Sequence, residues 1–141
     1  METIKVLAVT LLSGTVAQLI KVLTYFLQHK KVNLKRFFET GGMPSSHAST
    51  SATLTFQIAF WAGFNSPIFA STAFFAFVIM YDAAGLRRAA GKQAAVINKI
   101  IDEFKQTHHL KEERLMELLG HTPLEVFFGA LLGLVIALIF K

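Results

Sequence analysis

Serine and histidine side chains gather just before one apolar run, in the segment Gly41–His47, which reads GGMPSSH. Ser45 or Ser46 is placed to cap a helix, and the first N–H groups of a helix bind anions readily. The imidazole of His47 adds a proton donor at the same point. We therefore predict that Ser45, Ser46 and His47 bind a phosphate group. The alternative is a turn closed by a capping serine.

A second histidine precedes the last apolar run, in the segment Gly120–Glu125. Thr122 as N-cap, Pro123 at the first helical position and Glu125 two residues later form a capping box, which by itself explains Glu125. His121 stands just outside this cap, where a carboxylate one turn later can orient its imidazole. A histidine held by a carboxylate is the arrangement that positions a nucleophile or a base.

Charged side chains accompany both motifs. Arg87 and Arg88 follow the third apolar run and can clamp a phosphate through their planar guanidinium groups, with Asp82 as the orienting partner. The alternative for the two arginines is a cluster that ends a membrane span and meets lipid headgroups. Lys21 lies near the end of the first apolar run, with Gln18 one turn earlier. Its alternative is snorkelling to the headgroups.

Four apolar runs must position these motifs, in a chain that carries few charges. Hydrophobic residues make up 53% of the sequence and charged residues 16%, against roughly 25% charged in a soluble domain. The runs are Ile4–Leu27, Ala48–Phe64, Pro67–Leu86 and Leu124–Phe140. A 17-residue helix rises about 25 Å, slightly less than a hydrocarbon core of about 30 Å. We predict one all-α domain over residues 1–141, an integral membrane bundle of about four short transmembrane helices.

The basic residues fall almost entirely on one predicted side of the membrane. If all four runs span, residues 28–47 and 87–123 form loops on that side, and these loops together with the nearby Lys21 hold all of the 14 Lys and Arg residues except Lys5 and Lys141. The positive-inside rule places these loops in the cytoplasm and the protein in the cell membrane. The net charge of +5 therefore indicates orientation rather than a nucleic-acid partner. In the alternative topology, Ala48–Leu86 is a re-entrant hairpin.

Two further patterns concern surfaces for packing. In Gln93–Gln106, apolar residues recur at three- and four-residue spacing, and Leu110–Leu119 is similar but richer in charge. They predict an amphipathic helix hairpin on the cytoplasmic surface. Gly129 and Gly133 on the last run offer a close helix-packing face, from which we expect a homo-oligomer. The alternative is packing within the chain.

The chemically capable residues come from all four runs, yet they are predicted to meet at one membrane edge. Together they suit a phosphate monoester at the lipid interface, and they are Lys21, His47, Asp82, Arg87, Arg88, His121 and Glu125. A divalent-metal site is disfavoured because the surrounding cations oppose it. The absence of cysteine excludes thiolate ligands and a cysteine nucleophile. We expect His108 and His109 to be solvated.

Three segments together resemble the divergent branch of the type-2 phosphatidic acid phosphatase family, whose superfamily includes the vanadium haloperoxidases. They are Gly41–His47, Tyr81–Ala94 and Leu118–Val126, and the resemblance covers nearly the whole chain in order and spacing. It implies phosphoryl transfer through a phosphohistidine intermediate, with no metal or other cofactor.

The resemblance also implies roles for the residues of two motifs. His121 is the nucleophile, and Glu125 orients it from a position where the family usually carries aspartate. His47 is the general acid that protonates the leaving alcohol. Ser45 binds phosphate with nearby backbone N–H groups, and Ser46 stands where glycine is usual.

The cationic part of the family pattern is changed. The usual Lys-x6-Arg-Pro motif does not occur, so Lys21 or the Lys35–Arg36 pair takes its place. Leu115 stands six residues before His121, where the family carries arginine. We therefore expect Arg87 or Arg88 to supply the guanidinium, held by Asp82.

Two functions follow from these residues. The first is a lipid phosphate phosphatase acting on phosphatidylglycerophosphate, phosphatidic acid or a prenyl phosphate, with a bell-shaped pH profile because His47 must be protonated and His121 neutral. The second is a scaffold that binds lipid phosphate without turnover, suggested by Ser46, Glu125 and the missing first motif. A lipid or ion transporter is disfavoured because the polar residues form no path across the membrane.

Overall fold

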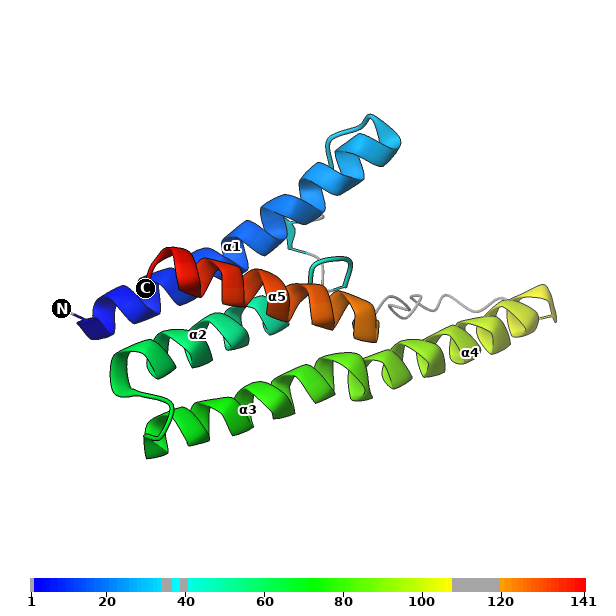
Figure 1. The fold of residues 1–141 in the computed structure, drawn as a ribbon. Helices are drawn as coiled ribbons and strands as arrows, with labels where there is room; N and C mark the ends of the chain where they lie inside the picture. The colour runs from blue at the N-terminus through cyan, green and yellow to red at the C-terminus, as the bar shows by residue number, and fades with distance from the viewer. Residues whose placement is uncertain (1, 34–36, 39–40, 108–119) are drawn as a thin grey trace.

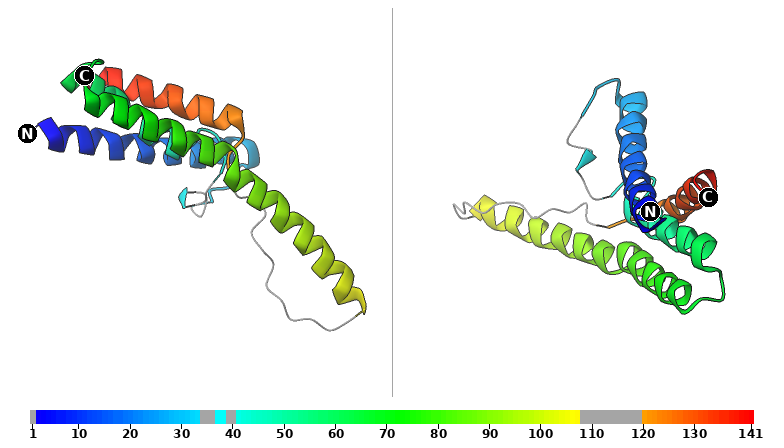
Figure 2. Two further views of the ribbon diagram at one scale, coloured as in Figure 1. Left: turned by 90° about the horizontal axis from the view of Figure 1, so that it is seen from below. Right: turned by 90° about the vertical axis from the view of Figure 1, so that its left-hand side faces the viewer.

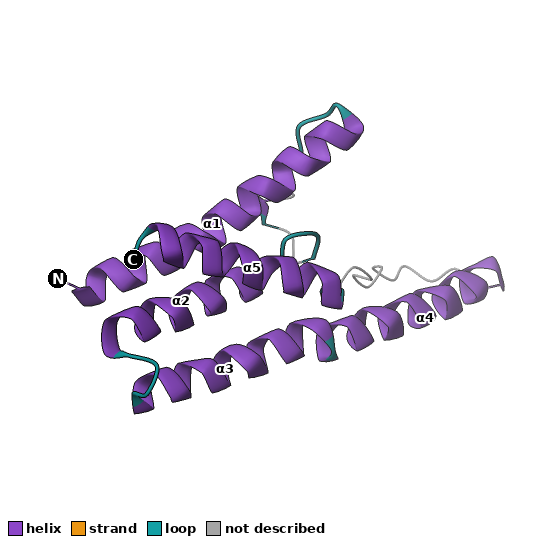
Figure 3. Cartoon of the chain, in the orientation of Figure 1, coloured by secondary structure: helices purple, strands orange, loops and turns teal. Residues whose placement is uncertain are grey.

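The computed structural model describes residues 2–33, 37–38, 41–107 and 120–141, without the side chains of residues 2, 86–88 and 105–107. Within these residues the chain forms five α-helices and no strand, which confirms the all-α prediction (Figure 3). The helices are α1 (Glu2–His29), α2 (Ser46–Ala62), α3 (Pro67–Ala84), α4 (Leu86–Thr107) and α5 (Pro123–Ile139).

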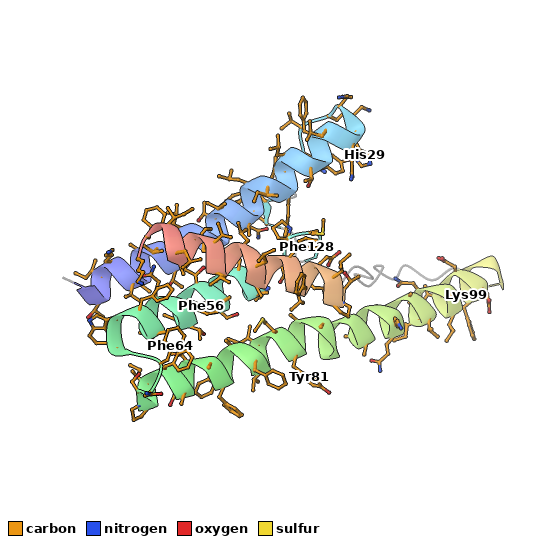
Figure 4. The ribbon with its side chains drawn as sticks, viewed as in Figure 1. His29, Phe56, Phe64, Tyr81, Lys99 and Phe128 are labelled. Carbon is orange, nitrogen blue, oxygen red and sulfur yellow. The ribbon has the colours of Figure 1, made fainter. Side chains whose placement is uncertain are left out.

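Helix α2 is the centre of the bundle. It packs against α5, α3 and α1, and these are the most extensive contacts between helices in the described part of the chain (Figure 1). Helix α3 returns beside α2 after a short turn, and α4 continues beyond α3 and projects past the other helices (Figures 1 and 2). Lys99 marks this projecting part of α4 (Figure 4). The ends of α2, α3 and α5 that carry the predicted site therefore come together.

The helices begin where local capping chemistry predicts. The Ser45 hydroxyl accepts a hydrogen bond from Ala48 N–H at 3.3 Å, so Ser45 rather than Ser46 is the N-cap of α2. Helix α2 thus starts two residues before the predicted Ala48, and His47 lies in its first turn. At α5, Thr122 and Glu125 form both bonds of the predicted capping box.

Gly129 and Gly133 are used inside the chain. A β-carbon at Gly129 would collide with the Ser45 carbonyl oxygen, and one at Gly133 would collide with the Ser49 carbonyl oxygen. The two glycines therefore let α5 lie directly against the backbone of α2. The alternative, packing within the chain, is confirmed for this face, so the two glycines give no support to a homo-oligomer. A homo-oligomer stays a prediction without that support.

Hydrogen bonds between hydroxyl groups hold the buried interior of α2 to its neighbours. Ser13 Oγ of α1 lies 2.6 Å from Ser49 Oγ, and Thr53 Oγ1 lies 2.7 Å from Ser13 Oγ and 3.0 Å from the Gly133 carbonyl oxygen. Gln57 donates to the Ala137 carbonyl at 3.2 Å. Such bonds between helices are effective where no water competes.

The outer faces of the bundle are apolar, as a bilayer requires. Large hydrophobic side chains are exposed along α1, α3 and α5, among them Leu11, Phe74, Phe77 and Leu138. Tyr81 on α3 is 71% exposed and points away from the other helices (Figure 4). Such a large apolar surface marks a site of interaction, here with lipid.

Two described helical stretches are long and apolar enough to cross a membrane, Thr3–His29 and Pro67–Phe104. Helix α5 is apolar but has 17 residues, and α2 has the same length with a Ser- and Thr-rich sequence. The structure thus supports a helical membrane protein, while the number of four crossings stays a prediction.

Helix α4 contains the predicted amphipathic segment Gln93–Gln106 but starts earlier, at Leu86, because Gly85 alone separates it from α3. Val96, Ile97, Ile100 and Phe104 are exposed on it. The second half of the predicted hairpin, Leu110–Leu119, lies outside the described residues, as do His108 and His109.

Candidate active site

His121 is fixed by two hydrogen bonds at the junction of α3 and α5, and a third holds its partner Glu125. Its backbone N–H donates to the Ala83 carbonyl at 2.8 Å, which joins the start of α5 to the last turn of α3. Its Nδ1 lies 3.1 Å from Glu125 Oε2, and the same carboxylate oxygen accepts the Thr122 N–H at 3.0 Å. Glu125 therefore closes the capping box and orients the imidazole at once.

This arrangement selects one tautomer of His121. A carboxylate oxygen accepts hydrogen bonds, so Nδ1 carries the proton and Nε2 keeps a lone pair. The side chain is 2% exposed, and Nε2 has no hydrogen-bond partner among the residues that the structure describes. A buried imidazole nitrogen with a lone pair and no protein partner is suited to attack an electrophile.

Burial lowers the pKa of His121, while the hydrogen bond that its Nδ1–H donates to Glu125 raises it. The charges of Lys21 and His47 act in the same direction as burial, and the net effect is a lowered pKa. His121 is therefore neutral at neutral pH, which is the form that a nucleophile needs.

His47 lies opposite His121. The two ring centroids are 6.0 Å apart, with an angle of 65° between the ring planes. The pair is held together through the backbone, because Ser45 N–H donates to the Glu125 carbonyl at 3.0 Å and thereby ties the start of α2 to the first turn of α5. The structure thus brings together the two histidines that the sequence predicts to act as a pair, from positions 74 residues apart along the chain (121 minus 47).

Lys21 reaches this site from α1. It is 5% exposed, its Nζ has no hydrogen-bond partner among the described residues, and its charge interacts with those of Glu125 and His121. Gln18, one turn earlier, also has a buried and unpartnered side-chain oxygen. A buried ammonium without a partner is costly unless an anion binds beside it. Lys21 therefore fits the predicted phosphate-binding role better than snorkelling.

Ser45 and Ser46 contribute different groups to the start of α2. Ser45 is fully buried, and its hydroxyl caps α2. Its carbonyl accepts the Ser49 N–H, and the N–H groups of the first turn of α2, which begins at Ser46, point toward the site end of the bundle. The positive end of the α2 dipole strengthens these groups as anion ligands.

The structure leaves the site roles of the remaining predicted residues untested. Asp82 is half-buried in the last turn of α3, next to Ala83. The backbones of Arg87 and Arg88 lie in the first turn of α4, and their side chains are outside the described set. Lys35 and Arg36 are outside it entirely. The roles of all five stay predictions.

Sequence reasoning missed a groove that opens beside His47. It has a volume of about 480 Å³ and runs between α2 and α3; its lining residues are Ser46, His47, Thr50, Ser51, Leu54, Thr72, Phe75, Ala76 and Ile79. Spacings of three and four residues from His47 through Thr50 or Ser51 to Leu54 form a helix face that begins at a histidine. This periodicity is the signal in the sequence from which the groove could have been predicted.

The comparison with known families decides what kind of protein carries this site. A family described as the divergent PAP2 family matches residues 3–136, a range that includes Lys21, both histidines and Glu125. The chain belongs to the divergent PAP2 family. It is also similar to a protein of Bacillus subtilis (strain 168) named "Uncharacterized membrane protein YuiD", with 42% identity over 134 residues that cover 87% of this chain and 85% of that protein. No solved structure matches the chain.

Membership of the divergent PAP2 family confirms the resemblance drawn from the three sequence segments. The apolar helices and the membrane-protein relative agree on a membrane location.

Proposed function

We propose that this protein is a lipid phosphate phosphatase, which hydrolyses a phosphomonoester lipid through a phosphohistidine at His121 and without a metal. The observation that carries the proposal is the buried His121, whose Nδ1 is bonded to Glu125 while its Nε2 has no partner among the described residues. His47, 6.0 Å away between ring centroids, supplies the second group that two-step phosphoryl transfer needs.

In the first step, the Nε2 lone pair of His121 attacks phosphorus, and the bond between phosphorus and the lipid oxygen breaks. Protonated His47 gives its proton to that oxygen, so a neutral alcohol leaves. In the second step, neutral His47 takes a proton from water, whose oxygen attacks phosphorus. The phosphorus–nitrogen bond breaks, its electron pair returns to Nε2, and inorganic phosphate leaves.

The phosphoryl oxygens need cationic and N–H partners during both steps. Lys21 and the first-turn N–H groups of α2 suit this role because they are buried or dipole-aligned, so they require little reorganisation. We assign Arg87 or Arg88 to the same oxygens, with Asp82 as the positioning residue. This assignment rests on the position of the two arginines, one turn after the Ala83 carbonyl that binds His121.

The charge pattern supports one side of the membrane for the site, and the proposed chemistry limits the substrate to phosphomonoester lipids. Because nearly all Lys and Arg residues belong to the segments at the site end of the bundle, we propose a multi-pass protein in the cell membrane with a cytoplasm-facing site. Phosphatidylglycerophosphate, phosphatidic acid and prenyl phosphates are lipids with the required phosphomonoester.

The test is phosphate release by the purified protein in lipid nanodiscs, with each of these three lipids as substrate. We expect activity in the wild type, a loss of about 10²–10⁴-fold in His47→Ala and at least as much in His121→Ala. His29→Ala is the matched control, because His29 is exposed and stacks on Tyr25 away from the pair.

Three results would count against this mechanism. Activity that EDTA abolishes and Mg²⁺ restores would contradict metal-free transfer. Unchanged turnover in His121→Ala would contradict the nucleophile assignment. A wild type that binds lipid phosphate and releases none would favour the non-catalytic scaffold, for which the unpartnered Lys21 is equally suited.

A further inference from the structure

The groove between α2 and α3 has one polar end and an apolar body. His47 and Ser46 lie at the polar end, in the first turn of α2, and Leu54, Phe75 and Ile79 line the rest. Its volume of about 480 Å³ is within the range of about 300–1,000 Å³ that is usual for small-molecule sites. It is therefore large enough for part of a lipid and is joined to the candidate active site through His47.

The hydroxyl groups along the groove do not make its wall polar. Ser51 donates to the His47 carbonyl at 2.8 Å, and Thr72 donates to the Ile68 carbonyl at 2.9 Å. The hydroxyl of Thr50 lies toward α1, because a β-carbon added to Gly14 of α1 would be 2.7 Å from the Thr50 Oγ1 atom. Because the Ser51 and Thr72 hydroxyls are bonded to helix carbonyls and the Thr50 hydroxyl lies toward α1, the surface left to a ligand is largely hydrocarbon.

The length and depth of the groove match part of one lipid chain. From His47 to Leu54 is seven residues of helix, or about 10 Å. One leaflet of a hydrocarbon core of about 30 Å is about 15 Å deep. The α3 side of the groove belongs to the stretch Pro67–Phe104, which is long and apolar enough to cross a membrane. A chain in the groove would therefore run from the site into the bilayer.

We propose that this α2–α3 groove binds one hydrocarbon chain, carried by the alcohol whose oxygen His47 protonates. The inference rests on the proposed function, because it assigns the leaving-group side of the phosphate to the groove and the opposite side to His121. It identifies the substrate class as a phosphomonoester whose leaving alcohol bears a long chain close to the phosphate. Inorganic phosphate and short soluble phosphate esters leave the groove empty and are poor ligands.

Photo-crosslinking tests the occupant directly. The probe is decyl phosphonate with a diazirine near the end of its chain, added to wild type and to His121→Ala in nanodiscs. We expect adducts in both proteins on groove residues such as Leu54 and Phe75, removed by excess unlabelled decyl phosphonate. Adducts spread over the outward residues Leu11 and Leu138, with none in the groove, would overturn the proposal.

Phosphate release from a lipid phosphate, measured on the same protein preparations without the phosphonate probe, separates this inference from the proposed function. A wild type that is labelled in the groove but releases no phosphate contradicts the phosphatase and supports the groove as a lipid-phosphate site. A wild type that hydrolyses lipid phosphate but is labelled elsewhere overturns the groove alone.

A variant series gives a second measurement. Ala76→Leu fills the groove, and Ala70→Leu makes the same change at an exposed position of α3 outside it. Each buried methylene of the substrate chain is worth about fourfold in binding. If the leucine of Ala76→Leu displaces two or three methylenes from the groove, the ratio of kcat/KM for decyl phosphate to that for ethyl phosphate should fall by about tenfold or more. An unchanged ratio in folded Ala76→Leu would overturn the proposal. If that variant does not fold, the crosslinks in the wild type still decide.

Discussion

Glu125 serves the helix cap and the imidazole with one oxygen, and substitution can separate these two roles. In Glu125→Gln, the amide oxygen can still accept the Thr122 N–H and the His121 Nδ1–H, so the cap is retained while the negative charge is lost. In Thr122→Ala, the other half of the capping box is lost while the His121–Glu125 contact remains. The two variants form a matched pair.

The expected loss follows from the distance of 3.1 Å between Nδ1 and Oε2. At an effective dielectric constant of about 20, a carboxylate at this distance stabilises a full positive charge on the imidazole by about 5 kcal/mol. The transition state develops part of that charge, so we take about 3 kcal/mol as the loss. This corresponds to a decrease in kcat of about 100-fold for Glu125→Gln.

The assay is phosphate release from a saturating lipid phosphate, together with thermal unfolding of the same preparations. We expect Glu125→Gln to lower kcat by the amount given and to change the melting temperature little. Thr122→Ala should lower stability by about 1 kcal/mol and keep kcat within a few-fold of the wild type. The reasoning would be refuted by the reverse pattern, with normal turnover in Glu125→Gln and slow turnover in Thr122→Ala.

Three further predictions concern the charge, the pH and the packing at the site. Lys21→Met removes a buried ammonium that has no hydrogen-bond partner among the described residues. It should weaken inhibition by vanadate about tenfold or more, while the melting temperature stays equal or rises. Unchanged inhibition would exclude Lys21 from the phosphate site. Because the pKa of His121 is lowered in the protein without substrate, the acidic limb of kcat/KM against pH should lie below about 6.5. The same lowered pKa makes the free energy of unfolding decrease as pH falls below about 6.5, because His121 binds a proton more readily in the unfolded chain than in the folded chain. A free energy of unfolding that does not change between pH 7 and 5 would contradict this prediction. Gly133→Ala should cost about 1–3 kcal/mol in thermal unfolding because its β-carbon meets the backbone of α2, and an unchanged melting temperature would show that α5 does not pack there.

Features that depend on a few neighbouring residues were predictable from the sequence. The spacing Thr122, Pro123 and Glu125 was enough for the capping box, because its bonds join residues three apart. The four apolar runs were predictable for a similar reason, since each is a helix whose backbone bonds are local. The pairing of His47 with His121 followed from topology, because both lie at the N-terminal ends of helices that start at the same end of the bundle.

Other features depend on which surfaces meet, and the sequence left them open. Helix α2 is as free of charge as a lipid-facing helix, but the bonds of its Ser49 and Thr53 to Ser13 of α1, and its contacts with three other helices, show that it is the helix the others enclose. Gly129 and Gly133 suit a second copy of the chain as well as α2, and only the observed approach of α5 to α2 decides between them.

By itself, then, the sequence determined the helices, their caps and the family, because these depend on residue types and short spacings. The tertiary structure decided that Lys21 is buried near His121 without a hydrogen-bond partner among the described residues, that one glutamate oxygen serves both cap and imidazole, and that a groove leads away from His47. The physical reason is that a buried charge, a shared acceptor and a cavity are properties of the space between helices. That space exists once α1, α2, α3 and α5 have packed.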